Sequence, residues 1–403
     1  MSTFLIVGKS FSGIENSISE RGDSLIVLVD SSVKNTSQKL SVDFSDRSSL
    51  DNTINSLVGK VDAVFWVYEN YVTHAAYIAK SLGILGLPVE AAERATDKLL
   101  MRQAFSKVPE EISANYSLVE NEESLLDFAK KQGFPLVIKP ANLTKSLLVT
   151  KSQNKSELLE NYKKTIAIID KVYSRYAPGR PPKLIVEEFL EGAAYSVEAF
   201  ADKNGIIHIL DQIVDYQTGY DIGYDDNFHY SRILPSKLSH SDQAALRKIA
   251  KLGVQALGMR NSPAHVEIIY TERGPRIVEI GARNGGYRSR MHRLANGLDI
   301  NQISLDLAIG KQPHIIATKN ESCAVLELFP KTPGKFLGIN NEDGLKELSS
   351  LKYLKIKQKI GGRVGKSSDG YKMCAIIALH NTDAAQFNKD LEFVNNQVRI
   401  RTA

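Results

Sequence analysis

Cysteine is scarce in this chain, with two among 403 residues, and this scarcity narrows the classes of protein that it can encode. Cys323 and Cys374 lie far apart, and neither has a cysteine or histidine at the spacing of metal ligands. A disulfide framework or a zinc site is therefore not expected. We predict that both thiols are reduced residues of the core.

Long apolar segments are also missing, because nowhere do 18 apolar residues follow one another. The first residues, Met1-Ser2-Thr3-Phe4-Leu5-Ile6-Val7, contain no basic leader. These two absences predict a soluble, cytoplasmic protein without a membrane partner.

Charge of one sign is not concentrated anywhere in the chain. The 51 Lys and Arg residues against 46 Asp and Glu give a formal net charge of +5, without a long block of either sign. This balance favours small anionic ligands and argues against a nucleic-acid-binding surface. The sequence also contains no internal repeat and no low-complexity tract.

The length and the 43% hydrophobic content are those of a globular protein with two or three domains. Residues 4–7, 25–29 and 61–67 read as strands separated by helical patterns, which predicts a parallel α/β unit at the N-terminus. The turn 8–13 lacks a complete dinucleotide or P-loop fingerprint, so we interpret it as a structural connection.

The middle of the chain predicts a mixed α+β unit that holds a nucleotide. Residues 97–105 and 122–132 read as helices, and residues 134–140, 184–190, 195–201 and 206–213 as strands. The Asn204-Gly205 pair predicts a hairpin turn between the last two. Lys139 ends an apolar strand, where it must reach solvent or an anion because burying it unpaired is costly.

Two later regions carry weaker patterns. Residues 215–230 are rich in Tyr, Gly and Asp without an apolar period, which indicates a long loop of the kind that covers substrates. After residue 314 the chain alternates short strands with glycine-rich turns, which indicates a small closing subdomain.

Two glutamates form the most informative pattern. Residues 264–270 and 276–281 read as the strands of a hairpin. With a three-residue loop 272–274, Glu267 lies directly opposite Glu279, and Gly274 takes the left-handed position. Like charges paired this way are destabilising unless a cation lies between them. Mg²⁺ or Mn²⁺ would supply it, although nearby Lys or Arg residues on an ordinary hairpin would serve as well.

Four segments together resemble the signatures of ATP-grasp enzymes, in the order in which that family carries them. They are Thr96-Asp97-Lys98 with Arg102, Phe134-Pro135-Leu136-Val137-Ile138-Lys139-Pro140, Val186-Glu187-Glu188-Phe189-Leu190-Glu191-Gly192, and Glu279-Ile280-Gly281-Ala282-Arg283-Asn284-Gly285-Gly286. The resemblance runs from about residue 4 to residue 400 and is nearest to the carboxylate–amine ligases that join amino acids.

The resemblance implies a fold that combines α/β and α+β parts. It places an N-terminal Rossmann-like domain at 1–95 and the small, or lid, portion of the ATP-grasp domain with its linker helix at 96–195. The large portion with the metal and phosphate site follows at 196–313, and a β-rich C-terminal subdomain at 314–403.

The resemblance also implies roles for single residues around ATP and Mg²⁺ (or Mn²⁺). Lys98 and Lys139 would meet the ATP phosphates, and Glu187 with the backbone of Glu188, Phe189 and Leu190 would bind adenine. Glu267 and Glu279 would hold the metal, and Arg283 would steady the acyl-phosphate. Lys145 and Ser146 of the phosphate loop would also contact ATP. The residues that would contact substrate, besides Arg283, are Gly285, Gly286, Arg288 and His229.

Several positions carry a second interpretation or depart from the family. Lys98 and Arg102 are equally ordinary residues of a solvated helix, and His265 is better explained as a satisfied structural histidine. The loop 141–147 lacks the usual glycines, so Thr144, Lys145 and Ser146 would contact phosphate through side chains. Ala194 and Gly281 stand where relatives often keep an acidic residue near the ribose and an asparagine near the metal.

We therefore expect an ATP-dependent ligase that joins a small-molecule carboxylate to an amine through an acyl-phosphate, with an amino acid as the carboxylate substrate. Two alternatives stay open. One is an ATP-grasp carboxylase or nucleotide-pathway ligase that activates bicarbonate or formate, and the other is a non-catalytic ATP-binding regulatory or scaffold protein. A homodimer is also left open.

Overall fold

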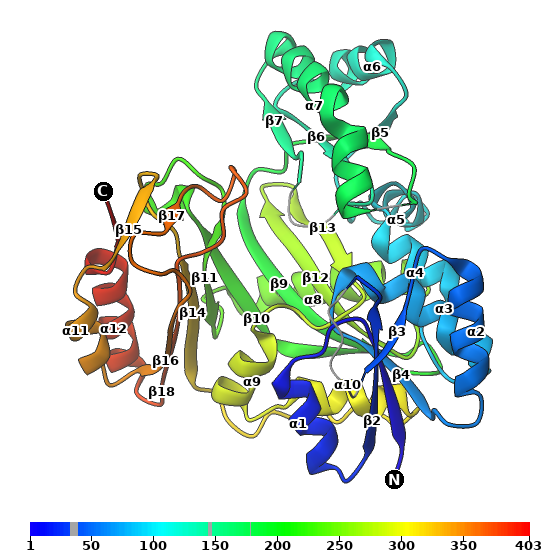
Figure 1. Cartoon of the computed structure of the whole chain (residues 1–403). Coiled ribbons are helices and arrows are strands. Elements are labelled where there is room, and N and C mark those ends of the chain that lie inside the picture. The colour runs from blue at the N-terminus through cyan, green and yellow to red at the C-terminus, as the bar shows by residue number, and fades with distance from the viewer. Residues whose placement is uncertain (33–38, 144–146, 178) are drawn as a thin grey trace.

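A computed structural model describes residues 1–32, 39–143, 147–177 and 179–403. Figure 1 shows a large sheet at the centre, with a small unit of strands and helices above it. The N-terminal strands and helices lie to one side of the large sheet, and the C-terminal segment lies to the other.

The N-terminal part is a parallel sheet, as predicted, but it has four strands in the order β3-β2-β1-β4, and the edge strand β3 is an addition to the three expected strands. Alternate residues of β1 enter two different cores. Phe4 and Ile6 pack with α1 and with α10 (Ile300–Ala308), whereas Leu5 and Val7 pack with α2 and α3. The elements are β1 (Thr3–Val7), α1 (Ser12–Glu20), β2 (Ser24–Asp30), β3 (Lys39–Val42), α2 (Arg47–Leu57), β4 (Ala63–Trp66), η1 (Glu69–Tyr71), α3 (Val72–Leu82) and α4 (Val89–Thr96).

Helix α5 (Lys98–Phe105) leads from this part to the small subdomain, a name we use for strands β5 to β8 with α6 and α7. The side chain of Asp97 caps α5 by accepting from the amides of Leu99 and Leu100. The small sheet is antiparallel in the order β5-β8-β6-β7. Its elements are β5 (Tyr116–Val119), α6 (Glu122–Gln132), β6 (Leu136–Pro140), β7 (Thr150–Ser152), α7 (Lys155–Tyr176) and β8 (Leu184–Glu188).

The central sheet has eight antiparallel strands in the order β13-β12-β9-β10-β11-β14-β18-β16. The predicted Asn204-Gly205 turn joins β9 to β10, with Gly205 at a φ of 83°. The elements between the small subdomain and the C-terminal segment are β9 (Ala193–Ala201), β10 (Ile207–Thr218), η2 (Tyr220–Ile222), β11 (His229–Leu234), α8 (His240–Ala256), β12 (Ser262–Thr271), β13 (Gly274–Gly281), α9 (Arg288–Asn296) and α10 (Ile300–Ala308).

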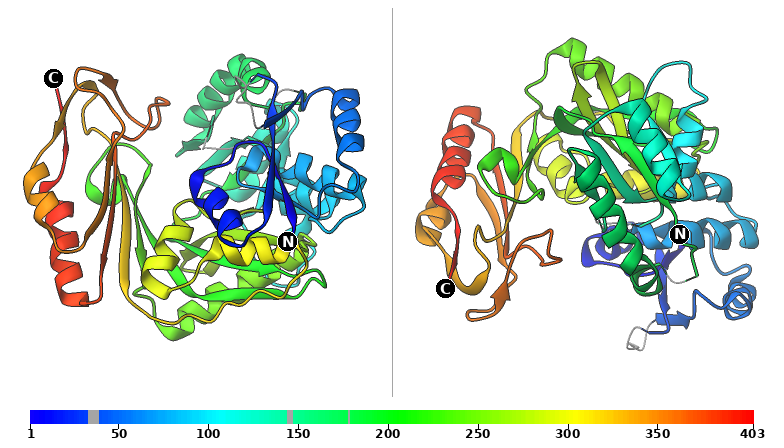
Figure 2. Two further views of the ribbon diagram at one scale, coloured as in Figure 1. Left: turned by 60° about the horizontal axis from the view of Figure 1, so that its bottom comes forward. Right: turned by 90° about the horizontal axis from the view of Figure 1, so that it is seen from above.

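The C-terminal segment continues the central sheet, because β14 pairs with β11 and then with β18. Figure 2 shows this segment standing apart from the N-terminal strands in both views. Its elements are β14 (Ser322–Leu328), β15 (Gly334–Ile339), α11 (Glu342–Glu347), β16 (Leu351–Ile356), β17 (Arg363–Val364), β18 (Ala375–Asn381), α12 (Ala384–Gln397) and β19 (Ile400–Thr402). The domain boundaries expected from the sequence stay predictions.

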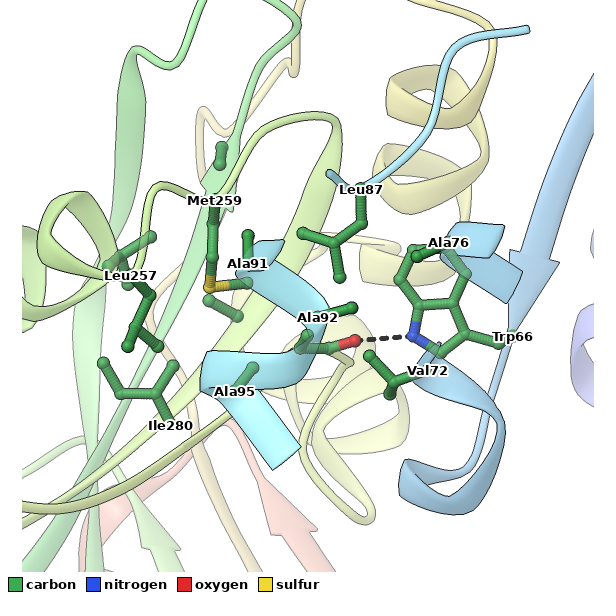
Figure 3. Packing of buried hydrophobic residues seen from close by; sticks show 14 of the residues in the cluster. Trp66, Val72, Ala76, Leu87, Ala91, Ala92, Ala95, Leu257, Met259 and Ile280 are labelled. Carbon is green, nitrogen blue, oxygen red and sulfur yellow. Dashed lines mark hydrogen bonds between the residues drawn. The ribbon is translucent and has the colours of Figure 1, made fainter. Parts of the chain in front are cut away.

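The N-terminal and central parts share one continuous core. Trp66 at the end of β4 packs beside Leu87 and Ala92, and the same cluster reaches Met259 and Ile280 of the central part (Figure 3). The indole Nε1 of Trp66 donates to the carbonyl oxygen of Ala282 at 2.6 Å. The N-terminal sheet is therefore fixed to the segment that follows β13.

The prediction of a long loop at 215–230 is wrong at both ends of that range. Residues 215–218 extend β10 and pair with β11, which begins at His229. The polar side chains of these residues do not show the apolar alternation of a strand, because their partners are polar groups inside the fold. Gln217 accepts from Ser231, and the Tyr216 hydroxyl accepts from Arg288. The remaining turn carries Phe228, which is buried against Phe329 of the C-terminal segment. It is packed down and does not form an open lid.

The hairpin of β12 and β13 places Glu267 opposite Glu279 as predicted, but by a different route. Thr271 pairs with Gly274, so the loop has two residues instead of three, and Gly274 has a φ of 89°. A β-bulge between the pairs Glu267–Glu279 and Ile268–Ile277 then restores the register. The bulge also lets both Ile277 and Ile280 face the core while Glu279 faces away.

Both cysteines are buried free thiols, as predicted. In the described ranges of the chain, the structure contains no helix that is long and apolar enough to span a membrane.

Candidate active site

Polar side chains gather on one face of the central sheet because strand residues alternate between two faces. On β9, Val197 and Ala199 belong to the core under α8. Between them, Glu198 points to the opposite face, where it meets His265 of β12. That face carries the candidate site.

The two central glutamates are partly exposed and each has a cationic neighbour. Side-chain exposure is 33% for Glu267 and 31% for Glu279. Lys98 Nζ lies 3.3 Å from Glu279 Oε2 and donates to the carbonyl oxygen of Leu143 at 3.0 Å. His265 Nε2 lies 3.3 Å from Glu267 Oε1. Lys98 is thus buried at the site, and its interpretation as an ordinary solvated helix residue is wrong.

The glutamate pair fits a Mg²⁺ ion that arrives with phosphate ligands. No group of three or more His, Cys, Asp or Glu side chains in the described residues forms a metal site by itself. Mg²⁺ commonly binds through one or two carboxylates together with substrate phosphates and water. Two facing carboxylates with open surface meet that requirement, so the predicted ligands remain Glu267 and Glu279.

His265 is a satisfied buried histidine, as its pattern suggested. Its Nδ1 lies 2.5 Å from Glu198 Oε1. Burial by itself would lower the pKa of His265, but the negative charge of Glu198 raises it to about 10. Burial opposes the shift of Glu198 as well, yet His265 and Arg288 hold the pKa of its carboxyl at about 2. The two groups form a buried ion pair directly behind Glu267.

A second buried ion cluster joins α5 to the small subdomain. Lys139 Nζ lies 2.6 Å from Glu187 Oε2, and Arg102 Nε lies 2.9 Å from Glu187 Oε1. Arg102 also donates to the carbonyl oxygen of Val278, the bulge residue, at 2.7 Å. Burial lowers the pKa of Lys139 and would raise that of Glu187, which the two cations hold down instead. Arg102 is completely buried, so it is no solvated helix residue.

The backbone of the expected adenine segment is partly used within the fold. The amides of Glu188 and Phe189 donate to the carbonyl oxygens of Asn115 and Pro135, both at 3.0 Å. Adenine contacts at these two residues would therefore use their carbonyl oxygens. Leu190 is a buried residue at the end of the segment.

Arg283 faces a glutamate that the sequence did not single out. Its Nε lies 2.8 Å from Glu69 Oε2, and Glu69 comes from η1 in the N-terminal part. Burial raises the pKa of Glu69 against the opposing charge of Arg283. A Cβ atom at Gly281 would lie 3.0 Å from Glu69 Oε2. The glycine at this departure from the family pattern therefore makes room for Glu69.

Arg288 and Gly285 differ from their expected roles. Arg288 is completely buried and donates to Ser196 Oγ at 2.9 Å and to the Tyr216 hydroxyl at 2.5 Å, so its fork is turned to protein and not to substrate. The amide of Gly285 donates to Glu198 Oε2 at 3.0 Å and is not free for an oxyanion. Gly286 has open space around its Cα, which leaves it as the accessible residue of this pair.

His229 and the C-terminal segment border the same face. The His229 ring centroid lies 4.6 Å from that of Tyr216, and burial lowers the pKa of His229 against the opposing charge of Glu267. From β14, Glu327 Oε1 accepts from the Tyr287 hydroxyl at 2.7 Å. The C-terminal segment therefore supports the chain just after Gly286.

A cavity of about 460 Å³ opens beside Glu69, between the carboxyl ends of the N-terminal strands and the small subdomain. This volume is in the range of small-molecule sites. A wider hollow of about 760 Å³ lies against the linker before β5 and does not include the charged cluster. The polar residues that line the smaller cavity include Asp30, Asp43, Glu69, His74, Asn142 and Arg180.

The site differs from the predicted set of residues in two further ways. Lys145 and Ser146, with Thr144, lie outside the described residues. The sequence reasoning missed Glu69 and Glu198 as members of the site. Glu198 is the one charged residue of β9, which is a local signal, whereas Glu69 reaches the site only through the fold.

Comparison with known proteins adds family information. Residues 132–290 match the ATP-grasp domain family. Alanine–anticapsin ligase of Bacillus subtilis (strain 168) is 30% identical over 272 residues, which are 62% of this chain and 54% of that protein. D-alanine–D-alanine ligase of Prochlorococcus marinus (strain MIT 9301) is 26% identical over 249 residues, 56% of this chain and 65% of that protein. The chain thus spans about half the length of the first of these relatives.

The fold has a close counterpart among solved structures. The crystal structure of L-amino acid ligase from Bacillus licheniformis superimposes with a TM-score of 0.83 at 18% identity, covering 100% of this chain and 99% of that one. The expected ATP-grasp architecture is therefore confirmed. The names of the relatives support the expected carboxylate–amine ligase branch.

Proposed function

This chain carries an ATP-grasp domain, and from that premise we propose that it is an ATP-dependent ligase that joins a carboxylate to an amine. The observation that carries the proposal is the pair Glu267 and Glu279, partly exposed and surrounded by Lys98, His265 and Arg283. Alternating acidic and basic groups on one face suit a phosphate chain held together with a divalent cation.

The reaction activates a poor electrophile. A carboxylate oxygen of the first substrate attacks the γ-phosphorus of ATP, the bond to the β-phosphate oxygen breaks, and ADP leaves. The amine nitrogen of the second substrate then attacks the acyl carbon of the acyl-phosphate, and phosphate leaves with the former carboxylate oxygen. The amine loses one proton, and the product is an amide or a dipeptide.

Each residue of the site has a task in this scheme. Lys98 and Lys139 would bind ATP phosphates as flexible point charges, and the planar fork of Arg283 would hold the acyl-phosphate. Glu267 and Glu279 would hold Mg²⁺, which supplies neutralisation of the charge on the β- and γ-phosphate oxygens when it is bound.

Adenine would sit at the strand end formed by Glu187 to Leu190, next to the ion cluster of Glu187 with Lys139 and Arg102. Because the carboxylate of Glu187 already has two cationic partners, its contact with the adenine amino group would use a remaining lone pair. The cationic partners also keep this carboxylate ionised and ready to accept.

The cavity beside Glu69 is the proposed place of an amino-acid substrate. Its lining carries three carboxylates, Asp30, Asp43 and Glu69, against one arginine, Arg180, and this excess of negative charge suits an ammonium group. Its lining residue Glu69 contacts Arg283, where the acyl-phosphate would form. This proximity would let one substrate approach the other without crossing bulk water, which would hydrolyse the intermediate.

The test is ADP and phosphate release by the full chain with ATP and Mg²⁺, measured over a matrix of amino-acid pairs and with bicarbonate and formate as separate acids. Glu279→Gln removes one proposed metal ligand without changing side-chain shape. Glu272→Gln, an exposed glutamate in the turn of the same hairpin, is the matched control.

We expect release that requires a particular pair, is lost in Glu279→Gln and is kept in Glu272→Gln, with an amide product identified by mass. Release driven by bicarbonate or formate would replace the proposal by the carboxylase or nucleotide-pathway alternative. Tight ATP binding without release for any acid would replace it by a non-catalytic ATP-binding protein.

A further inference from the structure

Glu198 is a buried carboxylate with partners on two sides of the site. Its residue exposure is 2%, and it lies in the middle of β9. Oε1 lies 2.5 Å from His265 Nδ1, and Oε2 accepts from the amide of Gly285 at 3.0 Å. Arg288 Nε lies 3.5 Å from Oε1.

One branch of these contacts leads to the glutamate pair. His265 uses its second ring nitrogen toward Glu267 Oε1, at 3.3 Å. The imidazole ring thus connects Glu198 and Glu267, and because both of its nitrogens have carboxylate partners, it has no freedom to rotate without losing a hydrogen bond. His265 is therefore the link between Glu198 and Glu267.

The other branch leads to the segment after Arg283. A Cβ atom at Gly285 would lie 2.5 Å from His265 Nδ1 and 2.7 Å from Glu198 Oε1. The backbone at Gly285 therefore rests directly on the Glu198–His265 pair. Arg288, held by Ser196 and Tyr216, packs against the same position.

We propose that Glu198 is a positioning residue that holds Glu267 and the Gly285 segment in register with each other. The inference rests on the proposed role of Glu267 as a metal ligand. Glu198 is not one of the residues proposed to bind nucleotide or metal, and it acts through its contacts with His265 and Gly285. A buried ion pair is often no more stabilising than apolar residues of the same volume. The contacts of the Glu198–His265 pair with two elements of the site explain its presence better than a gain in stability does.

The experiment measures Mn²⁺ binding to the full chain in the presence of ADP, from the loss of the free-ion electron paramagnetic resonance signal. This readout does not depend on ligase turnover. Loss of a residue that orients a metal ligand typically weakens metal affinity by about 10–100-fold. We expect a weakening of that size for Glu198→Gln.

Asp202→Asn is the matched control because Asp202 is a buried carboxylate four residues further along the same chain segment. It accepts from the amides of Asn204 and Ile206 at 2.8 and 2.9 Å and lies 3.3 Å from His208 Nε2, but these contacts are far from the glutamate pair in the fold. The control variant should bind Mn²⁺ with wild-type affinity even where its urea midpoint falls.

A second variant tests the connection itself. His265→Gln interrupts the branch to Glu267 while Glu198 stays in place. Because both substitutions act through one chain of contacts, we expect the double variant to bind Mn²⁺ no more weakly than Glu198→Gln alone. This variant also carries the test if Glu198→Gln does not fold.

Three outcomes would overturn the inference. Wild-type Mn²⁺ affinity in folded Glu198→Gln would show that Glu198 does not position Glu267. Fully additive losses in the double variant would show that the two residues act separately. Unchanged affinity in Glu267→Gln would remove the metal site itself and the inference with it, whereas a loss there with unchanged Glu198→Gln leaves the proposed function standing.

Discussion

At the scale of single residues, the cluster of Arg102, Lys139 and Glu187 shows how this protein uses buried charge. Each of these side chains is at most 8% exposed. A buried ion is tolerated only when its partners and hydrogen bonds replace the lost water. Arg102 meets this condition in part: Nη2 donates to Glu187 Oε2 at 3.3 Å and to the Val278 carbonyl oxygen at 2.7 Å, and Nε lies 2.9 Å from the charged Oε1 of Glu187. The cluster therefore ties α5, β8 and β13 together at one point.

We predict that Arg102→Met destabilises the protein strongly. It leaves the carboxylate of Glu187 buried with Lys139 as its remaining cation, and removing one partner of a buried pair costs about 3–5 kcal/mol. Urea unfolding measures the change. Lys164→Met, which breaks the exposed pair with Glu160 on α7, should leave the urea midpoint unchanged. A midpoint for Arg102→Met equal to that of this control would contradict the prediction.

His74 gives the stability of the protein a dependence on pH. Burial lowers its pKa from 6.5 to about 4, and the charges of Arg180 and Arg47 act in the same direction. Between pH 6.5 and 4, His74 is therefore protonated in the unfolded chain but neutral in the folded protein. The contribution of His74 to the free energy of unfolding is complete above pH 6.5 and is lost progressively as the pH falls toward 4.

We predict that His74→Gln flattens the decline of unfolding free energy between pH 6.5 and 4, because glutamine does not titrate. Urea midpoints of both proteins across this range measure the slope. His240→Gln, at the exposed start of α8, serves as the control and should keep the wild-type slope. Equal slopes for wild type and His74→Gln would refute the assignment.

Single residues also show where sequence reasoning ends. Lys98, Lys139, Glu267 and Arg283 were identified because a motif surrounds each of them, and the fold brings all four to one region. Glu69 has no such motif. It meets Arg283 across 214 positions of sequence, where the N-terminal and central parts pack together and Trp66 bonds Ala282. A long-range contact of this kind leaves no local pattern to read.

At the scale of elements, the hairpin of β12 and β13 combines a correct prediction with an incorrect reason. The glutamates do face each other, but the two-residue turn alone would have shifted β13 by one residue. The bulge at Val278 compensates for this shift. It leaves the Val278 carbonyl oxygen without a partner on β12, and Arg102 donates a hydrogen bond to that oxygen. The apolar pattern Ile277, Ile280 carries this information, because two core residues three apart cannot share one face of a regular strand.

The join between β8 and β9 depends on one glycine. Gly192 has a φ of 152°, and a Cβ atom there would lie 2.0 Å from the carbonyl oxygen of Tyr270 on β12. The chain passes this close because β9 pairs with β12 immediately afterwards. No rearrangement of a flexible side chain would relieve the contact, since the obstacle is backbone.

We predict that Gly192→Ala lowers the free energy of unfolding by more than backbone strain alone would. An unfavourable backbone conformation costs about 1–3 kcal/mol, and the clash with β12 adds to it. Gly59→Ala is the control, because Gly59 also has a positive φ of 73° but no atom within 4 Å of the added carbon. Urea unfolding should give a clearly larger loss for Gly192→Ala. Equal losses would mean that the approach of β12 is not constraining.

At the scale of the whole molecule, Glu188 provides a second attachment of the small subdomain to the central sheet, beside the Arg102 cluster. Its Oε2 lies 2.5 Å from Arg273 Nη2 in the turn of the β12–β13 hairpin. Its Oε1 accepts from the amide of Asn115 at 3.0 Å, in the linker that leads to β5. One carboxylate thus connects the subdomain, the linker and the sheet.

We predict that Arg273→Met loosens this attachment with little loss of global stability. The Arg273 side chain is 53% exposed, so solvent screens the pair although the Glu188 side chain is 10% exposed, and Glu188 keeps the amide of Asn115 as a partner. Screened ion pairs contribute about 0–1 kcal/mol. Amide hydrogen exchange in β8 should become faster, because local opening is governed by local contacts. Arg293→Met, which breaks a 57% exposed pair with Asp299, is the matched control. Unchanged exchange in β8 would contradict the role of Glu188 as an attachment point.

The position of the only tryptophan has an optical consequence. Trp66 is 5% exposed, and its indole hydrogen bond ends on Ala282, the residue next to Arg283. All indole fluorescence of this protein therefore originates at the junction between the N-terminal sheet and the segment that would hold phosphate. The chain carries a built-in emitter there, and its colour and intensity would report each movement of that junction without any attached label.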